Sequence, residues 1–413
     1  MRIILFHQHF KLPCSSGSTR NFELVRRLIE SGHDVTVVTG PLDLQENLIP
    51  EGLRIEIVKI DYQQQFSFAR KLLSFVGFGI GSVFYALRLD CDLAIASSTP
   101  LTIGIPGLVC KLVNRCPLIF EVRDVWPEIP IRMGLMKSKV AISCALALEK
   151  IIYRFSDSIV ALSPDMKSLV IEKGVPEGKI AVIPNACDFE LAGRSGLDLE
   201  VSAINEIKSI LREGKAIVYA GTIGRVNNVA YLAEAAKVAL LRFPLLKFVV
   251  IGEGSERQKL ASKARIDGTL GVNFFIFDPV PKSQIFHVIS LSAAVCNLVA
   301  PVQALGANSA NKFFDGLACG KPILLNHGGW MSDLVEGFGC GIVLEAEPCF
   351  SELERLENKL SDESWLNAAS SAALHLGKNY FDRDKLFEQY LCVIRKVISG
   401  QAFSVSFCAP GKY

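Results

Sequence analysis

Residues 308–325 read Asn-Ser-Ala-Asn-Lys-Phe-Phe-Asp-Gly-Leu-Ala-Cys-Gly-Lys-Pro-Ile-Leu-Leu. This pattern predicts a short helix, a glycine turn and then a buried strand. The free N–H groups and positive dipole end of such a helix suit a diphosphate. Lys312 adds a point charge, and Asp315, one turn on, could accept hydrogen bonds from ribose hydroxyls. The alternative is that both residues only cap and solubilise a surface helix.

The same alternation of helix and strand runs along the whole chain. Apolar segments that are hydrophobic throughout are typical of strands buried on both faces of a parallel sheet. In the first half we expect strands at 2–6, 34–39, 54–59, 93–96, 117–121, 158–161 and 180–183. In the second half we expect strands at 216–220, 247–251, 272–277, 293–297, 322–325 and 341–344.

The length of 413 residues favours two domains. A linker-like stretch at 184–188 divides the halves, so we expect an N-terminal Rossmann-like domain at 1–188 and a second one at 189–379. Two such α/β domains would face each other across a cleft, because ligands bind beyond the carboxyl ends of the strands. The last helical stretch, 383–398, has no sheet of its own to continue.

Composition narrows the class of protein. Half of the residues are hydrophobic and the net charge is +2, which argues against nucleic acid as the main partner. The twelve cysteines lie far apart in sequence, without a Cys-x-x-Cys pair or a Cys/His set of zinc spacing. We therefore expect a reduced, cytoplasmic compartment. Residues 1–9 turn polar after a few apolar positions, which predicts a first strand rather than a signal peptide.

The longest apolar region is Phe66–Leu89. Its middle, Leu72–Leu87, is interrupted by serines and glycines and is shorter than the about 20 residues that span a bilayer. Two alternatives stay open: a core helix that covers a sheet, or a helix that dips into an anionic membrane surface with Phe75 and Phe78 inserted. The second alternative would use the basic residues Lys11, Arg70, Lys71 and Arg88.

Two segments of the first half carry candidate site residues. The loop before the helix at Arg20 contains Gly17 and Ser18, and such a loop lets backbone N–H groups approach a phosphate, although most such loops are only turns. No G-x-G-x-x-G follows the first strand, which disfavours a dehydrogenase.

The second segment is Phe120–Glu128, with four charged residues at a strand exit: Glu121, Arg123, Asp124 and Glu128. Such charges are costly to bury unless they are paired or face a cleft. Glu121, Arg123 and Glu128 could bind the hydroxyls or the diphosphate of an acceptor. The alternative is an internal Arg–carboxylate cluster that fixes the turn.

In the second half, Gly221, Gly224 and Arg225 end a strand in a way that suits a diphosphate clamp. The alternative is a solvated loop arginine. Gly252 and Gly254 follow the next strand, and Val280 and Lys282 follow the one after. These positions are where a base and a ribose would lie.

Together these motifs resemble retaining glycosyltransferases of family 4, which have the GT-B fold. The segments Arg-Asp-x-Trp-Pro-Glu at 123–128 and Asn-x-x-Asn-Lys-x-Phe-Asp at 308–315 point to the bacterial branch that assembles O-antigen or capsule units on a lipid carrier. The resemblance implies that Asp124, Arg225 and Lys312 act in catalysis and that Val280 and Lys282 hold the uracil through backbone groups. It also implies that the terminal helix, 380–413, packs back on the first domain.

This chain departs from the family pattern in three places. Arg123 stands where a His is usual, and 226–228 lacks a usual Lys. Ala307 replaces the first of two glutamates, so Asn308 or Asn311 would have to supply its role on the donor side.

From the resemblance we expect transfer of an N-acetylamino sugar from a UDP-sugar to a lipid-linked saccharide, with retention, at the inner face of the cell membrane. No cofactor or metal is expected, because Arg225, Lys312 and a helix dipole can stabilise the departing diphosphate. The alternatives are a UDP-sugar 2-epimerase of the same fold, which needs carboxylates and histidines in the cleft, and a non-catalytic sugar-nucleotide-binding subunit.

Overall fold

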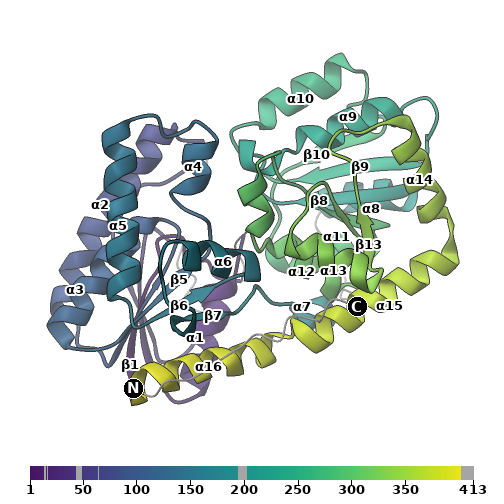
Figure 1. Cartoon of the computed structure of the whole chain (residues 1–413). Coiled ribbons are helices and arrows are strands. Elements are labelled where there is room, and N and C mark those ends of the chain that lie inside the picture. The colour runs from purple at the N-terminus through teal and green to yellow at the C-terminus, as the bar shows by residue number, and fades with distance from the viewer. Residues whose placement is uncertain (14, 16, 43–48, 64, 194–201, 401–413) are drawn as a thin grey trace.

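The computed structural model describes residues 1–13, 15, 17–42, 49–63, 65–193 and 202–400. It contains two α/β domains that lie side by side (Figure 1). Each has one sheet in which all strand pairs are parallel, with seven strands in the first domain and six in the second. The predicted fold class is therefore confirmed.

The first sheet has the order β3-β2-β1-β4-β5-β6-β7. Its strands are β1 (Arg2–Phe6), β2 (Asp34–Thr39), β3 (Leu53–Ile57), β4 (Leu93–Ser97), β5 (Leu118–Val122), β6 (Ser158–Ala161) and β7 (Ile180–Val182). Its helices are α1 (Arg20–Glu30), α2 (Phe68–Arg88), α3 (Gly104–Asn114), α4 (Glu128–Arg132), α5 (Lys139–Phe155) and α6 (Pro164–Glu172), with 3-10 turns at Leu101–Ile103 and Glu177–Lys179.

Alternate residues of each strand point to opposite faces of this sheet, and each face packs in its own hydrophobic core. Ile4 and Phe6 pack with residues of α2, α3 and α5. Ile3 and Leu5 pack with residues of α1 and of the terminal helix α16 (Arg383–Ser399). Burial on both faces explains why these strands are apolar throughout.

The second sheet has the order β10-β9-β8-β11-β12-β13. Its strands are β8 (Lys215–Ala220), β9 (Leu246–Ile251), β10 (Phe274–Phe277), β11 (Ala294–Asn297), β12 (Ile323–Leu325) and β13 (Gly341–Val343). One face is covered mainly by α8 (Ser202–Arg212), α11 (Lys282–Leu291), α12 (Asn311–Ala318), α13 (Trp330–Phe338) and α15 (Glu363–Tyr380). The other face is covered by α9 (Ala230–Ala239), α10 (Arg257–Ile266) and α14 (Phe350–Ser361). Short helical turns lie at η4 (Arg225–Asn227) and η5 (Gln303–Ala307), and α7 (Phe189–Gly193) follows the linker.

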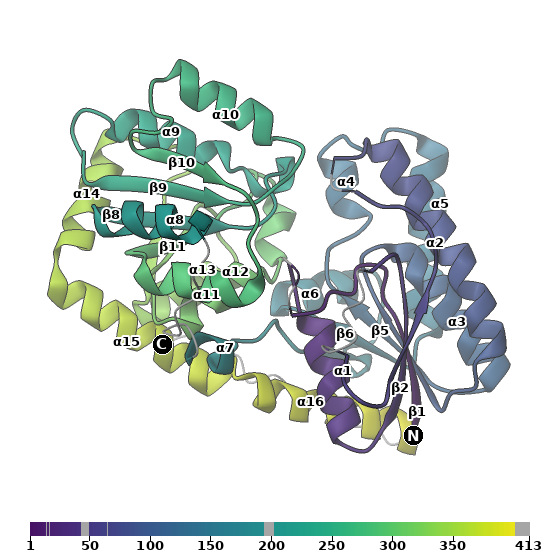
Figure 2. The ribbon, with the colours of Figure 1, turned by 180° about the vertical axis from the view of Figure 1, so that it is seen from behind.

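The chain crosses between the domains twice, at 184–188 and again at 381–383. The two crossings are joined where the Cys187 N–H donates to the Phe381 carbonyl at 2.8 Å. After the second crossing, α16 runs across the first domain (Figure 2), and Leu386, Tyr390 and Ile394 enter its core. Residues 401–413 of the predicted terminal segment lie outside the described residues.

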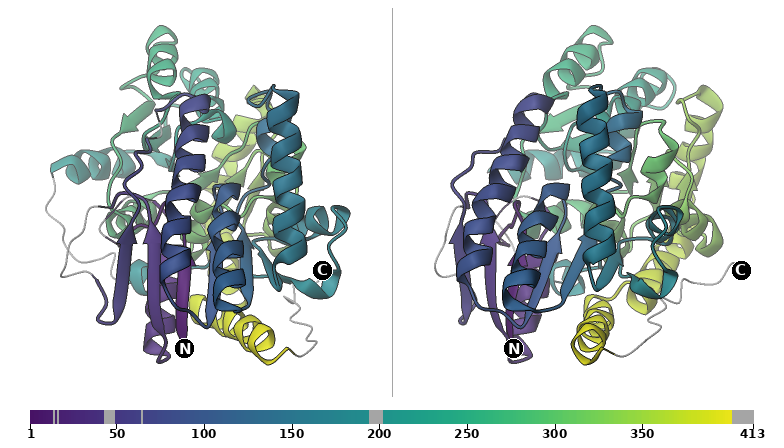
Figure 3. Two further views of the ribbon diagram at one scale, coloured as in Figure 1. Left: turned by 90° about the vertical axis from the view of Figure 1, so that its left-hand side faces the viewer. Right: turned by 60° about the vertical axis from the view of Figure 1, so that its left-hand side comes forward.

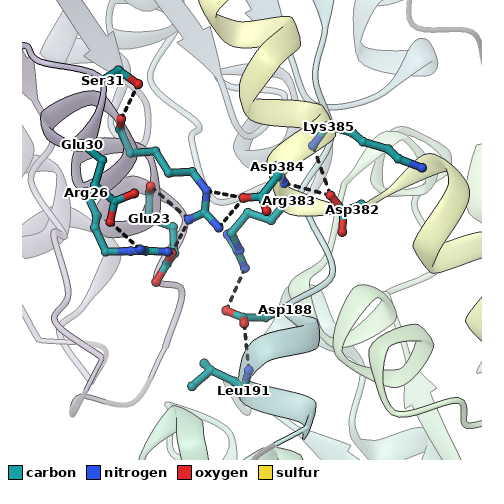
Figure 4. A network of polar contacts seen from close by, with 11 residues as sticks. Glu23, Arg26, Glu30, Ser31, Asp188, Leu191, Asp382, Arg383, Asp384 and Lys385 are labelled. Carbon is teal, nitrogen blue, oxygen red and sulfur yellow. Dashed lines mark hydrogen bonds and ion pairs between the residues drawn. The ribbon is translucent and has the colours of Figure 1, made fainter.

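A polar network fixes α16 at this crossing (Figure 4). Arg383 donates to Asp188 at 3.2 Å, and the guanidinium of Arg27 on α1 lies 2.8 Å from Asp384. The Asp382 side chain caps α16 by accepting from the Asp384 and Lys385 N–H groups.

The domains also contact each other directly. The Ser163 hydroxyl donates to the Ala307 carbonyl, and the Asn185 amide donates to the Ser309 carbonyl, each at 2.5 Å. Leu305 and Ala307 of the second domain join the apolar core on the α2, α3 and α5 side of the first.

Candidate functional site

Lys312 lies at the start of α12, beside the loop that follows β8. Its Nζ is 4.9 Å from the centre of the Tyr219 ring, and a Cβ built on Gly221 would lie 3.3 Å from its Cε. Burial lowers the Lys312 pKa to about 8. Among the described residues no carboxylate forms an ion pair with it. A shielded cation without a counter-ion at a helix start is suited to an anion.

The glycine loops after β8 and β9 press against each other. A Cβ on Gly252 would lie 1.9 Å from the Gly221 carbonyl oxygen, and a Cβ on Gly254 would lie 2.3 Å from that of Ile223. Backbone hydrogen bonds join the loops, from Gly221 to the Ile251 carbonyl and from Ile223 to the Glu253 carbonyl. Gly252 and Gly254 are thus required for loop packing, whereas a Cβ on Gly224 would meet only ordinary contacts.

Arg225 begins η4, directly after these glycines. Its side chain is 67% exposed and its Nε lies 3.4 Å from Glu256. An exposed pair of this kind is weak, so the guanidinium can exchange Glu256 for a phosphate.

Asp315 and Lys282 form a buried ion pair between α12 and the start of α11. Their burial excludes the alternative in which Asp315 solubilises a surface helix. The pair also shows that the Lys282 side chain is engaged inside the protein. Val280, two residues earlier, is partly buried against the same core.

The residues around the start of α12 leave polar atoms unused. The Asn308 side-chain oxygen is buried without a hydrogen-bond partner, as is that of Asn297 at the end of β11. Asn311 is the first residue of α12 and is partly buried. His327 follows β12, lies 3.5 Å from the Asn297 amide, and has its pKa lowered by burial. Neither Asn297 nor His327 was predicted from the sequence, although Asn297 ends the apolar strand β11 and His327 closely follows the apolar strand β12.

On the first domain, Glu121 has an internal role. It is fully buried, pairs with Arg20 at 2.9 Å and accepts from the Ser97 hydroxyl at 2.8 Å. Arg20 also donates to the carbonyl groups of Ile183 and Pro184. Glu121 therefore belongs to an internal Arg–carboxylate cluster, the second alternative given above. Because the Glu121 side chain is fully buried, the expected contact between Glu121 and an acceptor does not fit this structure.

Arg123 is held differently. Its guanidinium donates to His7 Nε2 at 3.0 Å and to the Ser18 hydroxyl at 3.3 Å. In the described part of the chain no carboxylate forms an ion pair with Arg123. The two predicted segments meet here, because Ser18 belongs to the glycine loop. Gly17 itself is exposed, with φ of +117°.

His7 was not predicted as a site residue, although it directly follows β1. Its Nδ1 lies 3.0 Å from the Ser97 carbonyl, so this nitrogen carries the proton and Nε2 accepts from Arg123. Burial and the Arg123 charge hold the His7 pKa well below its usual range. His7 is therefore a neutral residue that positions Arg123.

Asp124 accepts a hydrogen bond from the Thr99 hydroxyl. Burial, with a contribution from the Asp124 charge, raises the Tyr62 pKa to about 12. The Tyr62 ring is 4.4 Å from that of His9 and stacks on Phe75 at 5.5 Å. Glu128 is bound to Arg132 at 2.5 Å on α4.

Comparisons with known proteins agree with this architecture. Residues 17–191, less than half of the chain, match the model of Glycosyltransferase Family 4. A search of curated proteins found no match. HepE from Anabaena, in complex with UDP and glucose, has a TM-score of 0.70 at 16% identity, covering 96% of this chain and 100% of that one. Sucrose-phosphate synthase from Thermosynechococcus elongatus has a TM-score of 0.72 at 15% identity, covering 97% and 100%.

The chain has the GT-B fold. A candidate UDP-N-acetylglucosamine 2-epimerase from Listeria monocytogenes has a similar structure, with a TM-score of 0.62 at 11% identity over 98% of this chain and 99% of that one. GT-B proteins thus include more than one activity, and the functional argument must come from the site.

Proposed function

We propose that this GT-B protein is a retaining glycosyltransferase that moves an N-acetylamino sugar from a UDP-sugar to a lipid-linked saccharide in the synthesis of a surface polysaccharide. The observation that carries the proposal is a pair of cations without carboxylate partners among the described residues, Lys312 on one domain and Arg123 on the other. Each lies at the carboxyl ends of its sheet, where ligands of such sheets bind. Donor and lipid-linked acceptor each carry a diphosphate, so each cation has a matching anion.

On the donor side, Lys312 and the N-terminus of α12 would hold the diphosphate, with Arg225 closing over it. In the transfer, the bond between the sugar C1 and the UDP oxygen breaks, and UDP leaves with the electron pair. The acceptor oxygen bonds to C1, and its proton passes to the departing diphosphate. Lys312 acts by stabilising the charge that develops on the leaving diphosphate, and we assign Asp124 to the acceptor hydroxyl.

The site favours a transferase over an epimerase, which needs a free acid/base pair in the cleft. His7 has both ring nitrogens in use, and burial lowers the His9 pKa to about 3. Release of UDP from a UDP-sugar panel, with and without a lipid-linked acceptor, tests the proposal. Acceptor-dependent release supports it. Sugar interconversion without acceptor would identify an epimerase, and donor binding without turnover under both conditions would identify a binding subunit.

We expect Arg123→Met to raise KM for the acceptor more than KM for the donor. The loss of a charged hydrogen-bond donor should cost about 1.5–3 kcal/mol in kcat/KM for the acceptor. Arg123→Lys keeps the charge but loses the fork geometry, so it should recover only part of the activity. Arg132→Met, which removes an exposed arginine of the same domain, is the matched control. Equal effects of Arg123→Met on both substrates would contradict the assignment.

Membrane access depends on α2, where the structure corrects one expectation. Phe75 and Phe78 are 8% and 0% exposed and belong to the core, so they cannot insert into a membrane. The opposite face of α2 bears an exposed apolar stripe: Leu73, Val76, Ile80, Phe84 and Leu87. Figure 3 shows α2, α3 and α5 on one outer face of the first domain. By length and composition α2 could also cross a membrane, which for a single helix is weak evidence.

Basic residues flank the stripe. Arg70 lies over the Phe66 ring at 3.8 Å, and Arg88 lies over the Phe84 ring at 3.9 Å. Cations beside exposed apolar side chains suit an anionic bilayer surface. We therefore propose that this stripe, defined by residues 73, 76, 80, 84 and 87, brings the protein to its acceptor.

We expect the variant Leu73→Ser, Ile80→Ser, Phe84→Ser to lose most of its co-sedimentation with anionic vesicles. The matched control is Leu241→Ser, Ile266→Ser, Val272→Ser, which removes exposed apolar residues from the second domain and should sediment like the wild type. Equal partitioning of wild type and both variants would contradict membrane binding through α2.

A further inference from the structure

Three cysteines of the first domain meet at the edge of the sheet opposite the candidate site. Cys91 precedes β4, Cys116 precedes β5, and Cys110 lies near the end of α3. The three residues are 19 and 6 positions apart in the sequence, and the fold brings their side chains together.

The three sulfur atoms form a compact, buried cluster. Cys91 Sγ is 3.2 Å from Cys110 Sγ and 3.4 Å from Cys116 Sγ, and all three lie within 4.8 Å of one another. Cys91 and Cys116 are 4% and 5% exposed, and Cys110 is fully buried.

The spacing suits one metal ion better than a disulfide. Thiolates bind metals at about 2.3 Å, which places three sulfurs around one ion at about 3.8–4 Å from each other. A disulfide would need about 2.05 Å and would leave the third thiol without a role. Small outward movements of Cys91 would thus convert the cluster into a three-sulfur site.

Asn114 supports the cluster from outside. Its amide donates to the Cys110 carbonyl at 3.3 Å and lies 3.6 Å from the Cys110 sulfur, while its oxygen accepts from the Cys91 N–H at 3.1 Å. Outer-shell contacts of this kind orient metal ligands.

Thiolates are the form of cysteine that binds metal, so binding of an ion displaces the thiol protons.

We propose that Cys91, Cys110 and Cys116 bind one soft, thiolate-preferring metal ion, Zn²⁺ or Cu⁺, and release their thiol protons to solvent as they do so. Soft ligands select these ions. Across the described residues no His, Asp or Glu completes the group, so the site has three protein ligands. The bound ion would tie the starts of β4 and β5 to the end of α3.

The test uses the full-length protein, reduced and freed of metal, in two separate titrations against chromophoric chelators, one with Zn²⁺ alone and one with Cu⁺ alone. The wild type should bind one equivalent of at least one of the two ions and melt at a higher temperature with it. Asn114→Ala should weaken binding by about 10- to 100-fold, and Cys110→Ala should weaken it further. Cys340→Ala, which removes a buried cysteine of the second domain, should bind like the wild type.

A second readout needs no variant. Bound metal should slow alkylation of Cys91, Cys110 and Cys116, mapped by peptide mass, while Cys144, which is exposed, reacts at an unchanged rate. The proposal is overturned if neither ion protects these thiols, if Cys110→Ala binds as tightly as the wild type, or if mapping finds a stable disulfide within the group.

Discussion

Replacing Lys312 by Met should lower kcat by about 10²- to 10³-fold while leaving the fold intact. This is the usual cost of losing one donor that stabilises developing charge. The Lys312 ammonium lies beside the Tyr219 ring and the Gly221 loop. It forms no ion pair among the described residues, and Asp315 is paired with Lys282, so Met breaks no ion pair there. Turnover of the purified variant tests the loss of activity, and its far-UV circular dichroism tests whether the fold is intact.

The control for this variant is Lys359→Met. Lys359 also lies over an aromatic ring, 5.7 Å from that of Trp365, but on α14. It should retain wild-type turnover. Arg225→Ala should have a smaller effect than Lys312→Met, because Arg225 is exposed and shares its charge with Glu256. Comparable activity of Lys312→Met and Lys359→Met would remove Lys312 from the donor site.

The same residue predicts opposite responses of activity and stability to pH. Since the Lys312 pKa is lowered to about 8, kcat/KM for the donor should fall as the pH rises through 8 and the free enzyme loses the charge. Stability should rise between pH 8 and the usual lysine pKa of about 10.4, because there the unfolded chain binds more protons.

The second large effect concerns stability. Asp315→Asn should lower the free energy of unfolding by about 3–5 kcal/mol, because it leaves the Lys282 ammonium buried without its partner. Urea unfolding measures this cost. The sequence analysis assigned Asp315 to the ribose hydroxyls, and the buried pair with Lys282 adds a structural role that it did not predict.

The double variant Asp315→Leu, Lys282→Met separates stability from binding. Removing both charges should restore most of the lost stability, whereas UDP affinity should stay low if Asp315 also contacts the ribose. A double variant as unstable as Asp315→Asn would show that the pair is not the source of the cost.

The sequence predicted the architecture well because each strand carries its own signal. A segment such as Leu93–Ser97 is apolar throughout, and no distant partner is needed to recognise it. The place of Lys312 at a helix start was also predicted from local sequence and is confirmed; its role in the donor site stays a prediction.

Contacts between segments that are distant in the sequence could not be predicted from such local patterns. Glu121 and Arg20 are 101 positions apart, and Lys282 and Asp315 are 33 apart, so nothing local distinguishes a free carboxylate from a paired one. The outward face of α2 was misassigned for another reason. Both the inner and the outer face of α2 are apolar. The inner face carries small residues such as Gly79, Ser82 and Ala86, which let the helix pack closely against the domain. Large apolar side chains therefore lie on the outer face.

The central claim is that the start of α12, beside the Gly221 loop, holds the donor diphosphate through Lys312. Calorimetric titration with UDP and with UMP tests it directly, because the two ligands differ only in the β-phosphate. The wild type and Lys359→Met should bind UDP more tightly than UMP, and in Lys312→Met this preference should shrink by about tenfold or more, the value of a charged hydrogen bond. An undiminished preference for UDP in Lys312→Met would contradict the account.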